Sequence, residues 1–365
     1  MKMKNNNKGI TLVALVITII ILLILAGITI ASLRSSGLFS AAQDAKTKTE
    51  EKTEEENTIL EEYEDAITEQ VTGKKPLKPL ETNKKYESKA ELKDANGNKI
   101  VVPAGFKIVS DATTNNATTV DQGIVIEDAT GTDTNGSQFV WIPVGDIKKA
   151  DGTTTSIALN RYSFDSNGVA TEFTSTAFIE EDKTNTTSLK NYGNTISENI
   201  NAFKTSVATN GGFYIGRYEA RQNSSGKLTT VKTDSVWNDI TQPNAATNSK
   251  NMYSTGVTSE LMNSYAWDTA TLFLQTFGGN NKYSRQNSSN NGSLATTGTD
   301  NDKQCNVYDM ASNVYEWTTE TYSSSITPCT YRGGSYDSSA YPTSNRFSGS
   351  TSGYSNLGFR PLLFL

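Results

Sequence analysis

The feature that most constrains this chain is an unbroken apolar run near its start, over residues 10–33. About 24 residues at about 1.5 Å of rise per residue make about 36 Å of helix, which is enough to cross a bilayer. Lys2, Lys4 and Lys8 precede the run, and lysines in this position stay on the cytoplasmic side. The sequence therefore predicts a single-pass transmembrane helix over residues 10–33, with the C-terminal domain extracellular.

The letters just before this run, "KGITL", resemble the leader of type IV prepilins. The resemblance implies cleavage after Gly9, so that residues 1–9 form the leader and Ile10 becomes the new N-terminus. It departs from the family at Ala14, where prepilins usually carry the Glu that helps to register subunits in a filament. It implies a bacterial cell membrane as the location and pilin-like subunits as partners. A plain single-pass anchor is the alternative.

The next segment, residues 34–71, is rich in Ala, Glu, Lys and Gln, which favour helix. Its first half has no apolar stripe, and a helix that is polar all round usually spans solvent. We therefore expect a helical stalk, with a helix that packs on partner subunits as the alternative. Residues 72–100 read as a linker and a first hairpin, in which Asn96-Gly97 predicts a type I′ turn. Apolar residues return at helical spacing late in the stalk, at Ile59, Leu60, Tyr63, Ile67 and Val71.

Composition excludes several classes of function. The formal net charge of -6 argues against a nucleic-acid partner, because phosphate binding needs a basic face. The absence of histidine removes the usual general base near neutral pH and the commonest metal ligand. Two cysteines, Cys305 and Cys329, lack zinc-site spacing. In one interpretation they form a disulfide that closes a loop of about 25 residues and stabilises the folded chain by about 3 kcal/mol. In the other they are two buried free thiols.

Residues 101–365 predict one α+β domain with much irregular structure. "GSQFVWIPVG" and "GGFYIGRYEA" read as strands, and the Thr, Asn and Ser segments 146–209 and 221–255 read as long loops. The clearest helix prediction covers 259–277, where Ser259 would cap the start and Gly278-Gly279 would end the helix.

Three further segments, "VYDMASNVYEWTTE" (307–320), "YRGGSY" (331–336) and "LGFRPLL" (357–363), follow these strands in order. Together they resemble the formylglycine-generating-enzyme-like domain, a branch of the C-type-lectin fold, over roughly residues 104–365. The enzymes of that family carry two copper-binding cysteines after the R-G-G-S turn. Ser338 and Thr343 stand near those positions here, and a hydroxyl cannot replace a thiolate on copper. We therefore expect no copper and no enzyme. An enzyme of unknown type that uses carboxylates is a further alternative.

The resemblance also implies a calcium site in the loop that runs from Asp309 to Glu316. Asp309 and Glu316 would supply side-chain oxygens, and Ser312 and Val314 would supply backbone carbonyls; hard oxygen ligands suit calcium. The family usually has Gly at the Ser312 position, so the turn differs. In the alternative interpretation, Asp309 caps a turn and Glu316 pairs with an arginine such as Arg346 or Arg360.

Between the R-G-G-S and G-F-R motifs, residues 336–356 are rich in Tyr, Ser, Gly and Asn, which is the composition of antibody contact loops. The same region carries the mutated positions in retroelement-diversified proteins of this fold. We therefore expect a binding patch, diversified or fixed, for an external protein or glycan. The predicted contact residues are Tyr336, Asp337, Ser338, Ser339, Phe347, Ser348, Ser350, Ser352 and Tyr354.

Together these features predict a membrane-anchored, pilin-like surface protein that displays an adhesin-type domain. The first alternative is a minor pilin or structural surface subunit that binds only other subunits.

Overall fold

The computed structural model describes residues 12–35, 38–73, 76–110, 117–180, 196–232, 234–288, 292–299, 302–324 and 326–365. It divides into two compact units, Met1–Pro76 and Leu77–Leu365. The predicted leader cleavage site at Gly9 and Ile10 lies outside the described residues.

The first unit consists of two helices, α1 (Leu12–Ser35) and α2 (Leu38–Thr72). Among the residues that the structure describes, no helix combines the length and the apolar character needed to cross a membrane. In α2, the hydroxyls of Thr47, Thr49 and Thr53 each donate to the carbonyl four residues earlier, at 2.8–3.0 Å. These bonds satisfy the hydroxyls within the helix.

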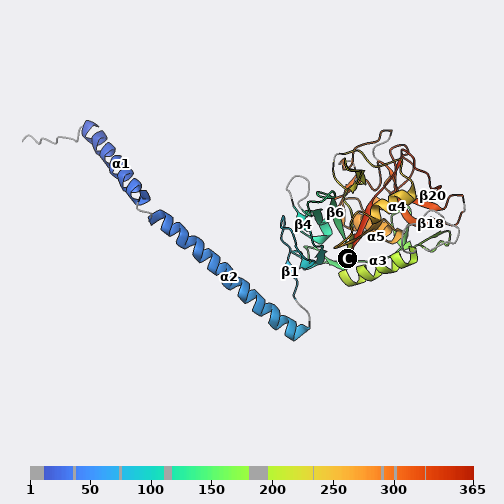
Figure 1. Cartoon of the computed structure of the whole chain (residues 1–365), viewed down its shortest axis with the longest axis horizontal. Coiled ribbons are helices and arrows are strands. Elements are labelled where there is room, and N and C mark those ends of the chain that lie inside the picture. The colour runs from blue at the N-terminus through green and yellow to red at the C-terminus, as the bar shows by residue number, and fades with distance from the viewer. Residues whose placement is uncertain are drawn as a thin grey trace, which may run out of the picture. The chain divides into compact units, whose positions relative to one another are not determined.

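The second unit is built on a six-stranded sheet in the order β15-β22-β12-β6-β5-β4. Figure 1 labels β4 and β6 of this sheet. Its neighbouring strands are antiparallel, and both faces are buried. Trp141 and Tyr214 point into one core cluster, whereas Ile142 and Phe213 point into the other, as the alternation of a strand requires. The predicted α+β class is confirmed. The strands are β4 (Phe106–Val109), β5 (Val125–Asp128), β6 (Gln138–Pro143), β12 (Gly212–Gly216), β15 (Thr258–Leu261) and β22 (Pro361–Phe364).

A second sheet carries the sequence motifs. Its order is β11-β18-β19-β20, and β21 pairs in parallel with β18. Strand β18 contains the "YEW" letters, β19 leads into the R-G-G-S turn, and β21 holds "LGF". Three motifs far apart in sequence therefore meet on neighbouring strands. The strands are β11 (Phe178–Ile179), β18 (Tyr315–Tyr322), β19 (Cys329–Arg332), β20 (Arg346–Gly349) and β21 (Leu357–Phe359).

Smaller pairings complete the strands of the second unit. The predicted hairpin is present as β2 and β3, but its turn is not type I′, because Gly97 has a positive φ of 86° and Asn96 does not. Asp94 organises this turn by accepting from the amides of Asn96 and Asn98. The small sheets contain β1 (Lys78–Pro79), β2 (Ala90–Lys93) and β3 (Lys99–Val102); β7 (Gly145–Lys148) and β8 (Thr154–Ile157); β9 (Tyr162–Phe164) and β10 (Ala170–Glu172); β13 (Arg221–Gln222) and β14 (Leu228–Thr229); β16 (Lys303–Gln304) and β17 (Val307–Tyr308).

Three helices cover the sheets. Helix α3 (Ile196–Asn210) packs on β12 and β22, α4 (Gln242–Lys250) on β15 and β18, and α5 (Ser264–Phe277) on β6 and β18. Figure 1 shows α3 along the lower edge of the domain, with α4 and α5 nearer its centre. Among the described residues, η1 (Val120–Gln122) and η3 (Tyr283–Arg285) are short 3-10 turns.

The predicted helix over 259–277 is wrong at its start. Ser259 lies in strand β15, and the true cap is Asn263, whose side chain accepts from the amide of Ala266 at 2.8 Å. A strand precedes the helix because the β15 segment pairs with β22, a contact that helical spacing does not reveal.

The two predicted long loops are also partly wrong. Segment 146–209 contains five short strands and most of α3, and segment 221–255 contains β13, β14 and α4. Ile200, Phe203 and Val207 give α3 a buried face at spacing three and four. This apolar spacing predicts a helix even though the surrounding sequence is polar.

Candidate functional site

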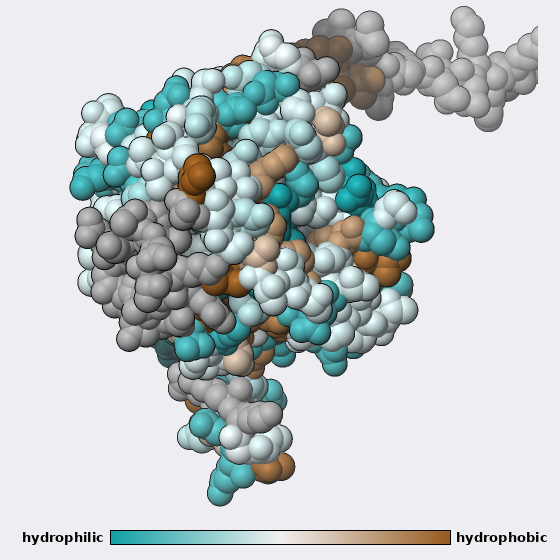
Figure 2. All heavy atoms as spheres, turned by 90° about the vertical axis from the view of Figure 1, so that its right-hand side faces the viewer, coloured by the Kyte–Doolittle hydropathy of each residue, from teal (hydrophilic) through white to brown (hydrophobic). Residues whose placement is uncertain are grey.

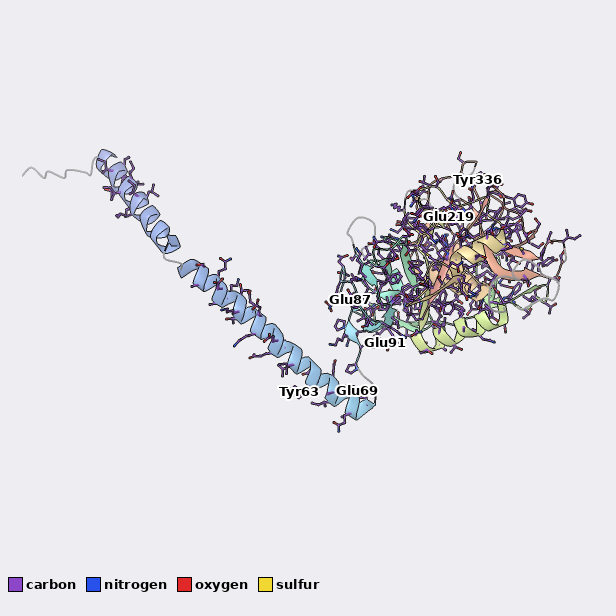
Figure 3. All side chains as sticks on the ribbon, in the orientation of Figure 1. Tyr63, Glu69, Glu87, Glu91, Glu219 and Tyr336 are labelled. Atoms are coloured by element: carbon purple, nitrogen blue, oxygen red, sulfur yellow. The ribbon has the colours of Figure 1, made fainter. Side chains whose placement is uncertain are left out.

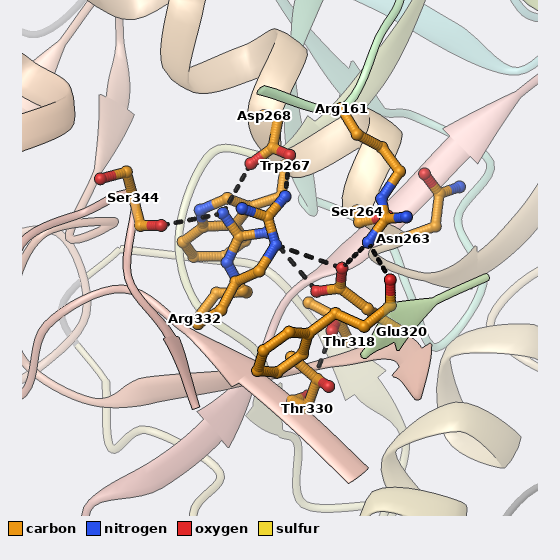
Figure 4. Close-up of polar contacts among 12 residues, drawn as sticks. Arg161, Asn263, Ser264, Trp267, Asp268, Thr318, Glu320, Thr330, Arg332 and Ser344 are labelled. Carbon is orange, nitrogen blue, oxygen red and sulfur yellow. Dashed lines mark hydrogen bonds and ion pairs between the residues drawn. The ribbon is translucent and has the colours of Figure 1, made fainter. Parts of the chain in front are cut away.

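The R-G-G-S arginine, Arg332, is held in a buried ion-pair network (Figure 4). It donates to Asp268 of α5 at 2.6 Å. Arg346 of β20 pairs with both Asp268 and Glu320, and Arg161 pairs with Glu320. Every charged group in this network is buried or nearly so. A buried charge that loses its partner is left without a counter-ion or water, which is strongly destabilising. The network therefore holds both ends of segment 332–346 against α5 and β18.

The G-F-R arginine, Arg360, forms a second buried pair. Its Nη2 donates to Glu316 Oε1 at 2.6 Å, and its Nε donates to Glu316 Oε2 at 3.1 Å. It also donates to the carbonyls of Gly216 and Tyr308, both at 2.8 Å. The pairing of Glu316 with Arg360 is the alternative that the sequence left open, whereas Arg346 belongs to the first network.

The two glycines of the turn pack against the loop that precedes β18. A Cβ on Gly334 would lie 2.1 Å from the carbonyl oxygen of Ala311, and one on Gly333 would lie 2.6 Å from that of Met310. Gly333 also has a positive φ of 84°. Only glycine fits at this approach of two backbones, which explains why the motif carries two.

The segment that this frame supports faces solvent. None of the nine predicted contact residues is buried; Asp337, Ser339, Ser352 and Tyr354 are exposed, and the other five are half-buried. Figure 3 places Tyr336 at the periphery of the domain, whereas Glu219 lies inside it. The backbone beneath is anchored, since Thr351 and Tyr354 accept from the amides of Gln242 and Asp239. The structure thus brings the predicted residues together on a fixed, solvent-facing segment.

Aromatic rings form the centre of this surface. Tyr331 and Phe347 are cross-strand partners that stack with centroids 5.1 Å apart and an interplanar angle of 21°. Tyr341 meets Phe347 edge-on at 4.5 Å, and the buried Tyr315 contacts all three rings from below. We call Tyr315, Tyr331, Tyr341 and Phe347 the aromatic cluster. Only Phe347 was predicted from sequence; strand pairing adds Tyr331, and Tyr341 lies inside the segment that composition had already marked.

Polar groups surround the aromatic cluster. Asp337 accepts from the hydroxyl of Ser335 at 2.6 Å and from the side-chain amide (Nδ2) of Asn356 at 2.7 Å, so its loop is held in place. The pKa of Tyr331 is raised by partial burial and then by the nearby Tyr341, Tyr354 and Asp337. The hydroxyl of Tyr331 therefore stays protonated at neutral pH and can both donate and accept. Figure 2 shows the side of the domain that faces right in Figure 1, where β18 and β20 are labelled; the coloured part of this face is mostly hydrophilic with small, separate apolar spots.

The predicted calcium loop fits an ion in part. Asp309 Oδ2 accepts from the amide of Gly298 at 2.7 Å, while its buried Oδ1 accepts from no residue that the structure describes. Glu316 is committed to Arg360, and Ser312 donates to Asp302. Among the described residues, no group of three or more carboxylate or thiol side chains is placed to hold a metal. An ion here would therefore depend on Asp309 and carbonyl oxygens.

Negative charge is in excess around this loop. Burial raises the pKa of Glu219 well above its usual range, and Asp309 and Glu316 raise it further. Burial likewise raises the pKa values of Asp302, Asp309 and Glu316. Arg360 counters these charges only in part, which makes the loop attractive to a further positive charge or to protons.

The predicted copper-site counterparts have separate roles. The buried hydroxyl of Thr343 donates to the carbonyl of Tyr283 at 2.8 Å, whereas Ser338 is half-buried beside Tyr315. Neither side chain is a ligand that copper prefers.

The disulfide interpretation of Cys305 and Cys329 is wrong, since both are free thiols. Cys329 lies on β19 and donates to Gln242 at 3.3 Å in the core. Cys305 lies in the turn before β17, beside the carbonyl of Asp121, and burial raises its pKa to about 12. The two thiols belong to different packing environments, which sequence spacing does not reveal.

With the frame and surface described, the class follows: this is a domain in which buried arginine–carboxylate pairs carry a solvent-facing C-terminal segment. The profile described as "Sulfatase-modifying factor enzyme 1-like domain" matches residues 132–363, and the chain belongs to this family. The resemblance to formylglycine-generating enzymes predicted from the motifs is confirmed.

Three solved structures are similar at low identity. CarF is 14% identical, with a TM-score of 0.32 over 42% of this chain and 87% of its own. The Major Tropism Determinant M1 variant is 11% identical, with a TM-score of 0.31 over 78% and 83%. Variable protein 1 of Treponema denticola is 16% identical, with a TM-score of 0.28 over 64% and 98%. No curated protein matches the sequence.

Proposed function

We propose that this chain is a membrane-anchored, pilin-like surface protein of bacteria that binds an external protein or glycan through residues 336–356. The observation that carries the proposal is the contrast within this segment. Its ends are fixed by the buried pairs of Arg332 and Arg360, while every predicted contact side chain between them reaches solvent. A rigid base under exposed Tyr and Ser side chains limits the entropy lost on binding.

The same arrangement supports a non-enzymatic role for this surface. Rings with exposed edges supply contact area, and the tyrosine hydroxyls and Asp337 supply directional bonds. The nine predicted contact side chains can change without breaking these ion pairs, because none of the nine takes part in them; Arg346 lies within the segment but belongs to the frame. Such independence suits a diversified surface as well as a fixed one.

A second candidate function, a structural subunit that binds only other subunits, is favoured by one feature of α2. Five apolar residues of its C-terminal half are 51–79% exposed. At about 100° per residue they fall within about 120° of the helix surface, so they form one stripe. Acidic residues surround the stripe in sequence, which suits a partner subunit with a basic apolar face. The stripe consists of Ile59, Leu60, Tyr63, Ile67 and Val71.

Two matched variants separate these functions. Tyr354→Ser changes a 52% exposed ring in the C-terminal segment, and Tyr63→Ser changes a 67% exposed ring in the α2 stripe. Cells that display each full chain are tested for adhesion to a panel of cell types and for cross-linking of the chain into larger assemblies. The adhesin proposal expects Tyr354→Ser alone to lose adhesion, by about tenfold or more for an anchor residue. The adhesin proposal would be overturned in favour of a structural subunit if Tyr63→Ser lost assembly and neither the unchanged chain nor the variants showed adhesion.

We further propose that calcium binds the loop at Asp309. The support is its buried Oδ1, which accepts from none of the residues that the structure describes, in a region with several other buried carboxyl groups. Bound calcium would supply positive charge there and stabilise the folded domain, by about 2.7 kcal/mol when its concentration is a hundred times Kd. Melting of the full chain is compared in calcium and in chelator, with Asp309→Asn and the exposed control Asp146→Asn. An equal melting temperature in both buffers for the unchanged chain rejects the site.

A further inference from the structure

A hydroxyl-lined hollow lies between the β5–β6 loop, the tip of the β13–β14 hairpin and the end of α4. Its volume is about 260 Å³, and a second hollow of about 200 Å³ adjoins it. The two share Thr134, Lys227, Asn251 and Met252. Pockets for drug-sized ligands usually run from about 300 Å³ upward, so this space suits a smaller molecule.

The hydroxyls in the hollow form a fixed row. Thr130 and Thr134 each donate to the buried carboxylate of Asp128 at 2.6 Å, and Tyr253 donates to it at 3.0 Å. Thr132 bridges the two threonines, with oxygen–oxygen distances of 2.9 and 3.0 Å. Asp128 is fully buried and accepts only, so it orients the row. The threonine spacing i, i+2, i+4 does not by itself predict a binding site, because polar residues are common in loops.

The walls of the hollow are also held together. The Asn223 side chain donates to the carbonyl of Asp133 at 2.8 Å and accepts from the amide of Lys227 at 2.9 Å. The β13–β14 hairpin is thereby tied to the threonine loop. Pre-ordered walls reduce the cost of binding a small ligand.

The chemistry of the lining selects the ligand class. Lys227 and Asp133 are the charged residues of the lining, and their charges offset each other, which disfavours a strongly charged ligand. Hydroxyl side chains both donate and accept, as the hydroxyls of a sugar do. The buried Met252 and the half-buried ring of Tyr253 add an apolar surface of the kind that faces a pyranose ring.

We propose that this hollow is a subsite for a neutral monosaccharide or the terminal sugar of a glycan. It is distinct from the C-terminal segment. That segment meets the start of α4, where Thr351 accepts from Gln242, whereas the hollow lies at the other end of the helix. Nine residues of helix separate the two by about 13 Å.

Saturation-transfer NMR on the full chain tests the proposal, in a detergent without a sugar headgroup so that the micelle does not compete. The probes are the methyl glycosides of glucose, galactose, mannose, fucose and N-acetylglucosamine. Binding is expected for at least one probe, and Thr132→Val and Asn251→Ala should each weaken it about tenfold by removing a hydrogen-bonding group. Both side chains are exposed, so both variants should fold.

Tyr354→Ser serves as the control and should leave sugar binding unchanged. Binding that is lost in Tyr354→Ser but retained in the two hollow variants would place the sugar on the C-terminal segment and overturn the proposal. The absence of saturation transfer for all five probes at tens of millimolar would do the same. A glucuronide that binds more tightly than every neutral probe, with Lys227→Gln abolishing the preference, would refute the neutral ligand class.

Discussion

Replacing Asp268 by Asn is expected to be the most destabilising conservative change in the frame. Asp268 accepts from Arg332 at 2.6 Å, from Arg346 and from the amide of Tyr162 at 2.9 Å. Its carboxylate is fully buried, and so is its partner Arg332. An asparagine removes the negative charge and replaces one acceptor oxygen with a donor that faces a guanidinium.

The magnitude follows from the burial. Removing one partner of a buried ion pair costs about 3–5 kcal/mol, because the other charge is left without water or a counter-ion. Glu320 would remain as the carboxylate shared among Arg161, Arg332 and Arg346. At about 2 °C per kcal/mol for a large domain, the melting temperature should fall by about 6–10 °C.

Tryptophan fluorescence is the suitable assay, since all four tryptophans lie in the second unit. Trp267 also reports locally, because the guanidinium of Arg332 lies 5.6 Å from its ring. The exposed Asp146→Asn serves as the control and should change stability by less than about 0.5 kcal/mol. A loss below about 1 kcal/mol for Asp268→Asn would refute the reasoning that this network holds the segment in place.

Three further outcomes are expected. Gly334→Ala should cost more than about 2 kcal/mol in urea unfolding, because its Cβ would lie 2.1 Å from a backbone oxygen, whereas Gly279→Ala has room and should not. Burial raises the pKa of Glu260 to about 7, so its folded form keeps a proton that the unfolded chain releases; stability should fall as pH rises from about 4.5 to 7, and Glu260→Gln should flatten that slope. Iodoacetamide at pH 8 should label Cys305 and Cys329 only when the chain is unfolded, and no reductant should be needed for that labelling. Labelling that requires a reductant would contradict the free thiols.

The family and the position of the exposed segment could both be predicted from the amino-acid sequence alone. The R-G-G-S and G-F-R motifs form close backbone contacts and buried charge pairs, which only particular residue types can make. Each motif can therefore be recognised from the identity of its own residues. The contact composition of residues 336–356 could be predicted for a different reason: solvent-facing side chains are not constrained by packing, so polar and aromatic residues accumulate there.

Only the tertiary structure decided which charges meet. Arg346 could have been assigned to Glu316, but sheet pairing places it with Asp268 and Glu320 and leaves Glu316 to Arg360. The aromatic cluster likewise depends on β19 lying beside β20, which brings Tyr331 onto Phe347. Within segment 146–209, strand β11 shows the same limit, because it pairs with the distant β18. Pairings between distant segments depend on the packing of the whole domain, and local sequence carries no record of them.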